Sequence, residues 1–217
     1  MTTFPGSPRL LKGGIVLIDP DTGAVERIIV LQYNPETLSR TLKIQSIEAS
    51  DDRSQALRLT GPPVETYQVE AEIDAADQLE FPDEHETVRQ HGIASQLAAL
   101  ETIIYPASGD LLSRNSLADA GTLEIAPLEA PLTLFVWSEN RVLPVRLTDL
   151  SITEEAFDPQ LNPIRAKVSL SMRVLSVDDL GFDHRGGNLF LTYQQQLERL
   201  ASLGQGGTFR DLGITGV

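Results

Sequence analysis

The sequence predicts an α+β protein, built as an antiparallel β-sandwich or barrel with one central helix and one C-terminal helix. Three observations lead to this prediction. Several segments alternate apolar and polar residues with a period of two, which is typical of half-buried antiparallel strands. Two other segments repeat apolar residues at helical spacing. The connections between the strand-like segments are rich in Gly, Pro, Asp and Asn, the residues that favour turns.

Length and charge limit the function. The chain has 217 residues, which suggests one large domain with appendages. Seventeen basic and thirty-one acidic residues give a net charge of −14. Nucleic acid and anionic membranes are therefore not expected partners, because both are bound by Lys and Arg that neutralise phosphates. The chain has no cysteine, which removes disulfides and thiolate chemistry and fits a reducing cytoplasm.

The chain is expected to divide into three parts. Residues 1–12 predict a flexible N-terminal arm, residues 13–180 a β domain, and residues 181–217 a C-terminal helix and tail. The N-terminus lacks the apolar core of a signal peptide. The longest apolar run, PLTLFVW, is too short to span a bilayer.

The first elements predict a hairpin and a strand. Residues 14–34 contain two apolar runs around an Asp- and Gly-containing turn, which predicts a β-hairpin. Residues 38–47 alternate between apolar and polar side chains and predict a strand. An irregularity in this pattern near Thr41 sets Leu38 and Arg40 on opposite faces. The segment 66–74 alternates more regularly and predicts a half-buried antiparallel strand.

Residues 83–104 change to helical spacing between Pro82 and Pro106 and predict the central helix. Gly92 lies inside it and is expected to weaken it by about 1 kcal/mol. The stretch 107–130 has no clear pattern, and such long connections are usually functional loops or disordered.

Three more strands and a helix complete the prediction, and their segments are 131–138, 141–155, 164–175 and 188–204. The first of these segments is apolar on both faces. The second changes phase at Asp149, which predicts a β-bulge or bend. The third has the most regular alternation in the chain, and the last is amphipathic.

No motif for catalysis or metal binding is complete. His85 and His91 are six residues apart, so on a helix they point away from each other instead of sharing a zinc ion. The stretch DPDTGAVERIIV lacks the Gly and Glu that a calcium loop requires. We therefore expect no enzyme activity, no cofactor and no metal. A hydrolase with an unfamiliar site is the least favoured alternative, because the chain has only three His and no Cys.

Five stretches, taken in order, resemble the tube-domain family of contractile injection systems, the phage-tail-like particles. They are VLQYNPETLSRTLK, GPPVETYQVEAEID, ETVRQHGIASQLAALETIIYP, APLTLFVWS and TDLSITEEAFDPQLNPIRAKVSLSM. The resemblance covers roughly residues 12–176. Ser138 stands where the family usually has Gly, and Ala130 precedes Pro131 where the family has a second Pro. No LysM module follows the domain, so that module's role is not carried over.

The resemblance implies a β domain of the tail-tube type and a structural role. It implies a homo-oligomeric ring of six copies in the baseplate or inner tube, joining the spike to the tube. The expected partners are further copies of the chain, the spike or hub protein, the tube and other baseplate proteins, within a particle assembled in the cytoplasm. The connection 107–130 and the C-terminal helix favour a baseplate ring over the tube itself.

The resemblance also gives a reason for the break in the ribbon at YNP. Asn34 is able to close an Asx turn, and Pro35 has no N–H, so a β-ladder cannot continue through it. We expect Tyr33 to anchor this corner and Leu38 to begin a strand that pairs with a neighbouring copy. The alternative is a bend within one subunit.

Polar faces and candidate joint residues follow from the same comparison. The polar faces of two strands are expected to line the lumen or the joint, where mixed charges would pair between neighbours; these are Glu70, Glu72, Arg165, Lys167 and Arg173. Trp137 is expected in the core. The complete set of candidate structural residues is Tyr33, Asn34, Pro35, Leu38, Arg40, Trp137, Arg165, Lys167 and Arg173.

A monomeric β-barrel that binds a small ligand is the main alternative function. Such a protein needs an interior pocket with convergent polar groups. The apolar inward face of residues 164–174 argues against one.

Overall fold

The computed structural model describes residues 11–45, 58–119, 130–204 and 206–216. Its strands are β1 (Gly14–Ile18), β2 (Val25–Val30), β3 (Leu38–Lys43), β4 (Val64–Asp74), β5 (Leu132–Ser138), β6 (Arg141–Phe157) and β7 (Pro163–Val174). Its helices are α1 (Ala76–Leu79), α2 (Glu86–His91), α3 (Ala94–Glu101), α4 (Ser108–Asp119), α5 (Val177–Leu180) and α6 (Arg185–Leu203). Most of the expected N-terminal arm lies outside the described residues.

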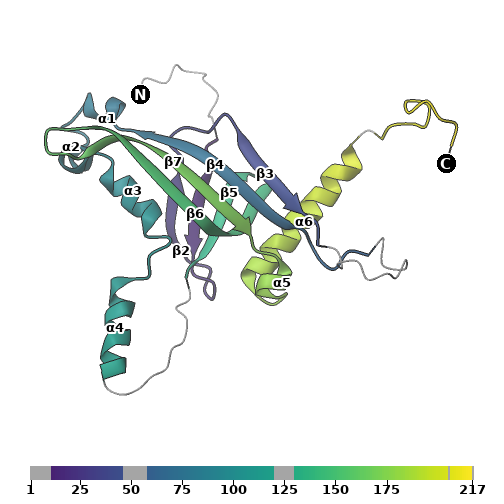
Figure 1. Cartoon of the computed structure of the whole chain (residues 1–217), viewed down its shortest axis with the longest axis horizontal. Coiled ribbons are helices and arrows are strands. Elements are labelled where there is room, and N and C mark those ends of the chain that lie inside the picture. Colours follow the sequence, from purple (N-terminus) through teal and green to yellow (C-terminus); the bar gives the residue numbers. More distant parts are fainter. Residues whose placement is uncertain (1–10, 46–57, 120–129, 205, 217) are drawn as a thin grey trace.

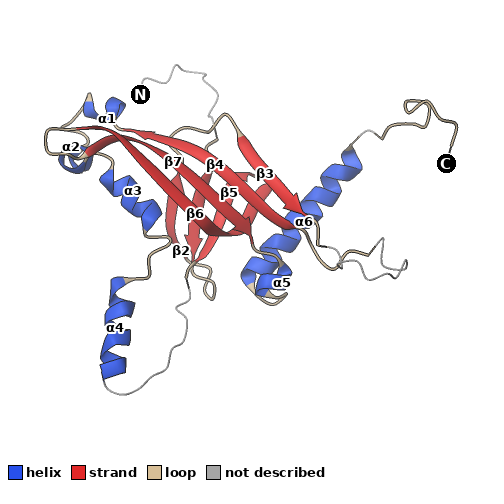
Figure 2. Ribbon diagram, in the orientation of Figure 1, coloured by secondary structure: helices blue, strands red, loops and turns tan. Residues whose placement is uncertain are grey.

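The strands form one antiparallel sheet in the order β2-β1-β5-β6-β7-β4-β3 (Figure 2). The predicted α+β class and antiparallel pairing are confirmed. The sheet is open, however, because within the described residues β2 pairs only with β1 and β3 only with β4. The described strands therefore do not close into a barrel, and the predicted sandwich or barrel type is not confirmed.

The open sheet is strongly curled. Tyr67 on β4 and Phe135 on β5 have ring centroids 5.6 Å apart, although β6 and β7 lie between their strands. Three strand spacings in a flat sheet would separate β4 from β5 by about 14 Å. The sheet must therefore bend around these rings, and the inward side chains fill the resulting core.

The predicted irregularity in β6 is a β-bulge. The register against β7 shifts between Leu147 and Asp149, so Thr148 is the extra residue. Val145 faces the core before the bulge, and Leu150 packs against the same core after it. This confirms the phase change that the sequence shows at Asp149.

The predicted central helix is interrupted. Gly92 has φ +56° and separates α2 from α3, so residues 83–104 do not form one helix. A Cβ at Gly92 would lie 2.1 Å from the carbonyl oxygen of Pro163, at the start of β7. The chain passes too close to β7 for any side chain here, and α3 then packs Leu97 and Leu100 into the core.

Two further helical regions extend from the body. Part of the 107–130 connection forms α4, which has no buried residue and projects away from the sheet (Figure 1). The predicted C-terminal helix is confirmed as α6, which begins at a His184 N-cap and buries Phe190 and Tyr193. Among the described residues, no helix is both long and apolar enough to cross a bilayer.

Candidate assembly edges

The YNP element connects the two ends of the sheet. β2 ends at Val30 and β3 begins at Leu38, yet these strands lie at opposite ends of the strand order. Pro35 falls in this short connection. The β-ribbon therefore stops where the chain leaves one sheet edge and goes on to form the other.

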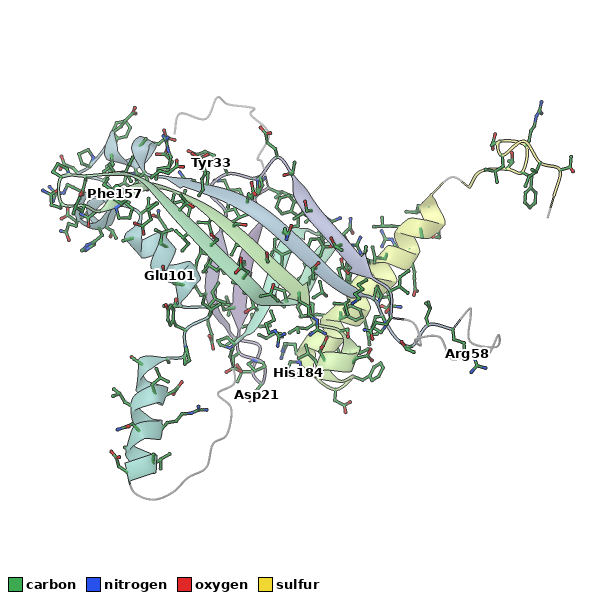
Figure 3. All side chains as sticks on the ribbon, in the orientation of Figure 1. Asp21, Tyr33, Arg58, Glu101, Phe157 and His184 are labelled. Carbon is green, nitrogen blue, oxygen red and sulfur yellow. The ribbon has the colours of Figure 1, made fainter. Side chains whose placement is uncertain are left out.

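Asn34 holds this corner to the start of β1. Its side-chain Oδ1 accepts a hydrogen bond from the Gly13 backbone N–H at 2.9 Å, and its Nδ2 donates to the Leu11 carbonyl at 2.7 Å. The carboxamide thus extends the β1–β2 pairing, where the prediction was a local Asx turn. The Tyr33 ring is exposed (Figure 3). Its hydroxyl accepts from Gln32 Nε2 at 3.3 Å.

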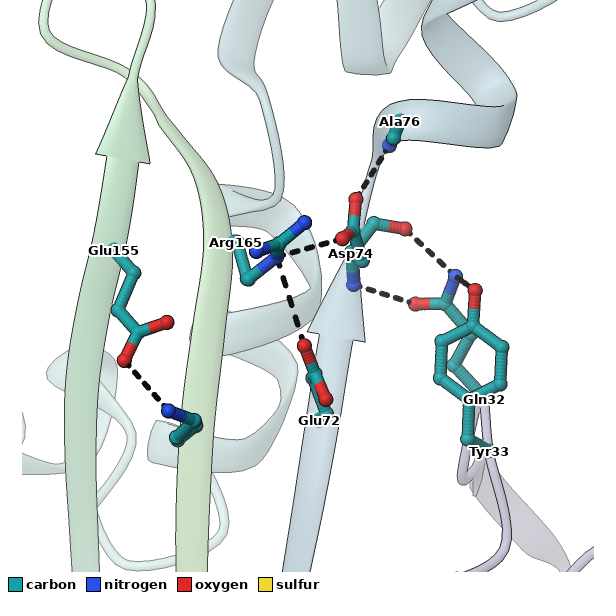
Figure 4. Close-up of polar contacts among 8 residues, drawn as sticks. Gln32, Tyr33, Glu72, Asp74, Ala76, Glu155 and Arg165 are labelled. Atoms are coloured by element: carbon teal, nitrogen blue, oxygen red, sulfur yellow. Dashed lines mark hydrogen bonds and ion pairs between the residues drawn. The ribbon is translucent and has the colours of Figure 1, made fainter.

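Gln32 joins the corner to the end of β4 (Figure 4). Its Nε2 donates to the Asp74 carbonyl at 2.7 Å, and its Oε1 accepts from the Asp74 N–H at 2.9 Å. The Asp74 carboxylate accepts from the Ala76 N–H and from Arg165 Nε, both at 2.7 Å. The Ala76 N–H first, and then Arg165, lower the pKa of Asp74. The Gln32 carboxamide therefore links the corner after β2 to the end of β4.

The outer face of β4, β7 and β6 is polar. Cross-strand rows on this face include Glu70–Ser169–Ser151 and Glu72–Lys167–Thr153. Three of its cations are paired within the chain: Arg165 with Asp74 and with Glu72 at 3.5 Å, Lys167 with Glu155 at 2.9 Å, and Arg173 with Asp179 at 2.7 Å. Of the charges that were expected to pair between neighbouring copies, Glu72, Arg165, Lys167 and Arg173 therefore have partners in one copy.

The outer face of β2, β1 and β5 is apolar. Directly opposed residues form the rows Val30–Gly14–Val136 and Ile28–Val16–Leu134. Leu180 and Leu189 pack on one end of this face, beside Ile18 and Leu132. At the edge, Ile28 and Val30 remain 61% and 55% exposed. We call Ile28, Val30, Val16 and Val136 the β2 apolar face.

On the inner face of β5, Trp137 is partly buried against the core. Its ring centroid lies 5.9 Å from that of Phe135. A Cβ at Gly13 would lie 2.8 Å from the indole, so the start of the chain passes directly over this ring. This placement agrees with the core position expected for Trp137.

The β3 edge contains a buried ion pair that the sequence did not reveal. Leu38 pairs with Val69 and Arg40 with Tyr67, so Arg40 shares the inward face with Leu38, contrary to the prediction. Arg40 Nε donates to Glu65 Oε1 at 2.5 Å. Glu65 is only 4% exposed.

Tyr193 connects this ion pair to α6. Its hydroxyl donates to Glu65 Oε1 at 3.1 Å and lies 3.5 Å from the Tyr67 hydroxyl. The Arg40 guanidinium lies 5.9 Å from the Tyr67 ring centroid and 6.0 Å from that of Tyr193, within cation–π range. Burial raises the pKa of both tyrosines. The β3 edge is therefore tied to the C-terminal helix.

One signal for Glu65 exists in the sequence. It occupies the same phase of the β4 alternation as Tyr67 and Val69, so the pattern places an acidic residue on the buried side. A buried carboxylate requires a cationic or hydrogen-bonding partner. The pattern does not identify that partner, because Arg40 and Tyr193 come from distant parts of the chain.

Comparison with known proteins gives one kind of match. No family model and no curated protein matches this chain. Among solved structures, the chain is similar to one from the tail of an empty GTA particle with C6 symmetry. The two share 13% identity, the similarity covers 75% of this chain and 90% of that chain, and the TM-score is 0.29.

Proposed function

We propose that this protein is a structural subunit of a phage-tail-like contractile injection particle. In this proposal, copies of the chain join edge to edge into a ring in the baseplate or inner tube, between the spike and the tube. The observation that carries the proposal is the open sheet, whose β2 edge adjoins exposed apolar side chains. The five sequence stretches that resemble the tube-domain family point to the same role.

The β2 edge has the chemistry of a contact surface. Natural edge strands are usually protected from pairing by charges, Pro, bulges or a covering element. β2 exposes Val25, Ile28 and Val30 beside backbone groups that pair with no described strand. A second copy that presents its β3 edge would complete the ladder and cover these side chains. Because the two edges differ, the contact is heterologous and closes into a ring by rotation.

The polar outer face suits a lumen. Ser151, Thr153, Ser169 and Ser171 lie on the same face as Arg165, Lys167 and Arg173, which are paired within the chain. Such a surface offers no apolar anchor to cargo or to a rod passing through the ring. The ring of six copies, the spike and tube partners, the cytoplasmic assembly and the absence of enzymatic activity belong to this proposal through the family resemblance. The N-terminal arm, the 107–130 connection and the C-terminal helix are its candidate contacts to other particle proteins.

The interior does not favour the alternative of a small-ligand barrel. Large side chains that are almost completely buried occupy the inside of the curl; among them are Tyr67, Phe135, Leu143, Leu170 and Met172. A ligand pocket needs space and convergent polar groups. The buried polar groups Arg40, Glu65 and Tyr193 are instead bonded to one another.

Sedimentation velocity tests the edge contact. Each copy carries a net charge of −14 and repels the next. Added sulfate should therefore favour assembly, because it screens this charge and strengthens apolar burial. We expect rings of wild-type chain that are lost in the Ile28→Lys/Val30→Lys variant. The matched control, Leu161→Lys, changes an exposed residue in the β6–β7 turn and should assemble as wild type. Equal assembly of the edge variant would refute the proposal.

A further inference from the structure

One apolar stripe of α6 extends beyond the sheet. Phe190 and Tyr193 are buried, and the same three- and four-residue spacing continues through Leu197, Leu200 and Leu203. These three leucines are 37%, 43% and 70% exposed, so exposure rises along the helix. Figure 1 shows α6 passing the end of β3 and continuing away from the body. Among the described residues, the stripe that packs in the first half of α6 is therefore less and less covered along the second half.

The buried ion pair fixes where this stripe leaves the body. Tyr193 bonds to Glu65, and Glu65 bonds to Arg40 on the edge strand β3. The next turn of α6 begins with Leu197. Any strand that pairs with β3 must therefore lie close to the exposed leucine stripe.

A second apolar patch flanks the opposite edge. Arg27 on β2 donates to the Ala99 carbonyl at 3.1 Å and to Thr102 Oγ1 at 2.5 Å, which holds the end of α3 beside β2. Ile104 and Tyr105 follow directly and are exposed. Like α6, α3 packs on the core side of the sheet. Each edge thus carries one exposed apolar patch, next to a helix whose buried residues belong to the same core.

Each of these helices also contains an unsatisfied acceptor. Gln96 Oε1 on α3 and Gln196 Oε1 on α6 are buried and have no hydrogen-bond partner among the described residues. A buried acceptor without a donor destabilises the folded chain. Gln196 immediately precedes Leu197, so this acceptor lies where α6 leaves the body.

We propose that residues 197–203 of α6 dock on the Ile104–Tyr105 patch of the neighbouring copy. This inference rests on the proposed edge pairing and adds a second contact to it. When β3 of one copy meets β2 of the next, the leucine stripe of the first reaches the end of α3 of the second. The partner of the C-terminal helix is then another copy of this chain, and the helix stabilises the contact between the two copies.

Cysteine cross-linking tests this contact, because the natural chain has no cysteine. Single-cysteine chains carrying Leu200→Cys and Tyr105→Cys are mixed under assembly conditions and treated with a flexible bismaleimide. A second mixture, Thr41→Cys with Ile28→Cys, probes the edge pairing at the middle of each strand. A third, Leu200→Cys with Leu161→Cys, is the background control. Thermal unfolding of each variant confirms that it is folded.

We expect both test mixtures to give covalent dimers at about tenfold the control yield or more, because a docked contact raises the effective concentration of the two thiols. Dimers through Thr41 and Ile28 without dimers through Leu200 and Tyr105 would overturn the α6 contact and leave the ring intact. Dimers through Leu200 and Tyr105 alone would support the helix contact and refute the edge pairing. Control-level yields in both mixtures would overturn both proposals.

Discussion

Replacing Arg40 by Met tests how the β3 edge is held. Glu65 is 4% exposed, and its Oε1 accepts from Arg40 and from Tyr193. The variant removes the cation and leaves a buried carboxylate with one neutral donor. Breaking a buried ion pair in this way costs about 3–5 kcal/mol. Because the Arg40 side chain is 27% exposed and water will replace part of it, we expect the lower end, about 3 kcal/mol.

A double-mutant cycle separates the ion pair from simple loss of packing. In Arg40→Met/Glu65→Gln, the carboxamide still accepts from Tyr193 but carries no charge. We expect this double variant to regain about 2 kcal/mol relative to Arg40→Met, because no unpaired charge stays buried. For a domain of this size, the 3 kcal/mol loss in Arg40→Met corresponds to a Tm lower by about 6–12 °C.

Urea unfolding followed by Trp137 fluorescence and by circular dichroism measures these free energies. Lys167→Met is the matched control, because its pair with Glu155 is exposed and such pairs contribute little to stability. If Arg40→Met destabilises the protein no more than Lys167→Met does, the Arg40–Glu65 contact does not hold the edge, and the placement of α6 beside β3 loses its support.

Three further outcomes follow from the structure. Burial raises the pKa of Tyr67 and Tyr193 in the folded protein. Their contribution to stability is therefore complete below about pH 10 and decreases above it, where the unfolded chain ionises first. In urea unfolding, the midpoint of the Tyr67→Phe/Tyr193→Phe variant should fall less with rising pH than that of the wild type. Gly92→Ala should lower stability by more than about 1 kcal/mol in thermal unfolding, because its Cβ would meet the Pro163 carbonyl. Gln32→Ala loses two partly buried hydrogen bonds and about 1–3 kcal/mol, and amide exchange should quicken at the end of β4.

Local alternation was sufficient to predict the strands. All seven strands lie in segments whose apolar residues repeat every second position or continuously, and the extra residue at Thr148 leaves a visible change of phase. The pattern assigns a face to each residue but not a neighbour to each strand. The choice between an open curled sheet and a closed barrel depends on which distant strands meet, so the sequence did not decide it.

Side-chain contacts between distant segments were the main source of error. Arg40 was placed on the face opposite Leu38, yet it shares the inward face with Leu38 and bonds to the buried Glu65. The local pattern does not predict the contacts of Gln32, because a polar residue near a turn is common. Gly92 was expected to weaken a helix; the actual interruption depends on Pro163, which lies far along the chain. Each error concerns a contact that the local pattern does not contain.

Amide hydrogen exchange of the unassembled and assembled chain tests the central claim most directly. Residues 25–30 and 38–43 have ladder partners on one side only, so some of their amides should exchange quickly in the single chain. On assembly these amides should become strongly protected, while those of β7, which has partners on both sides, should change little. Two results would contradict the proposed edge pairing. The amides of β2 and β3 could be as protected as those of β7 before assembly, or their exchange could stay unchanged after assembly.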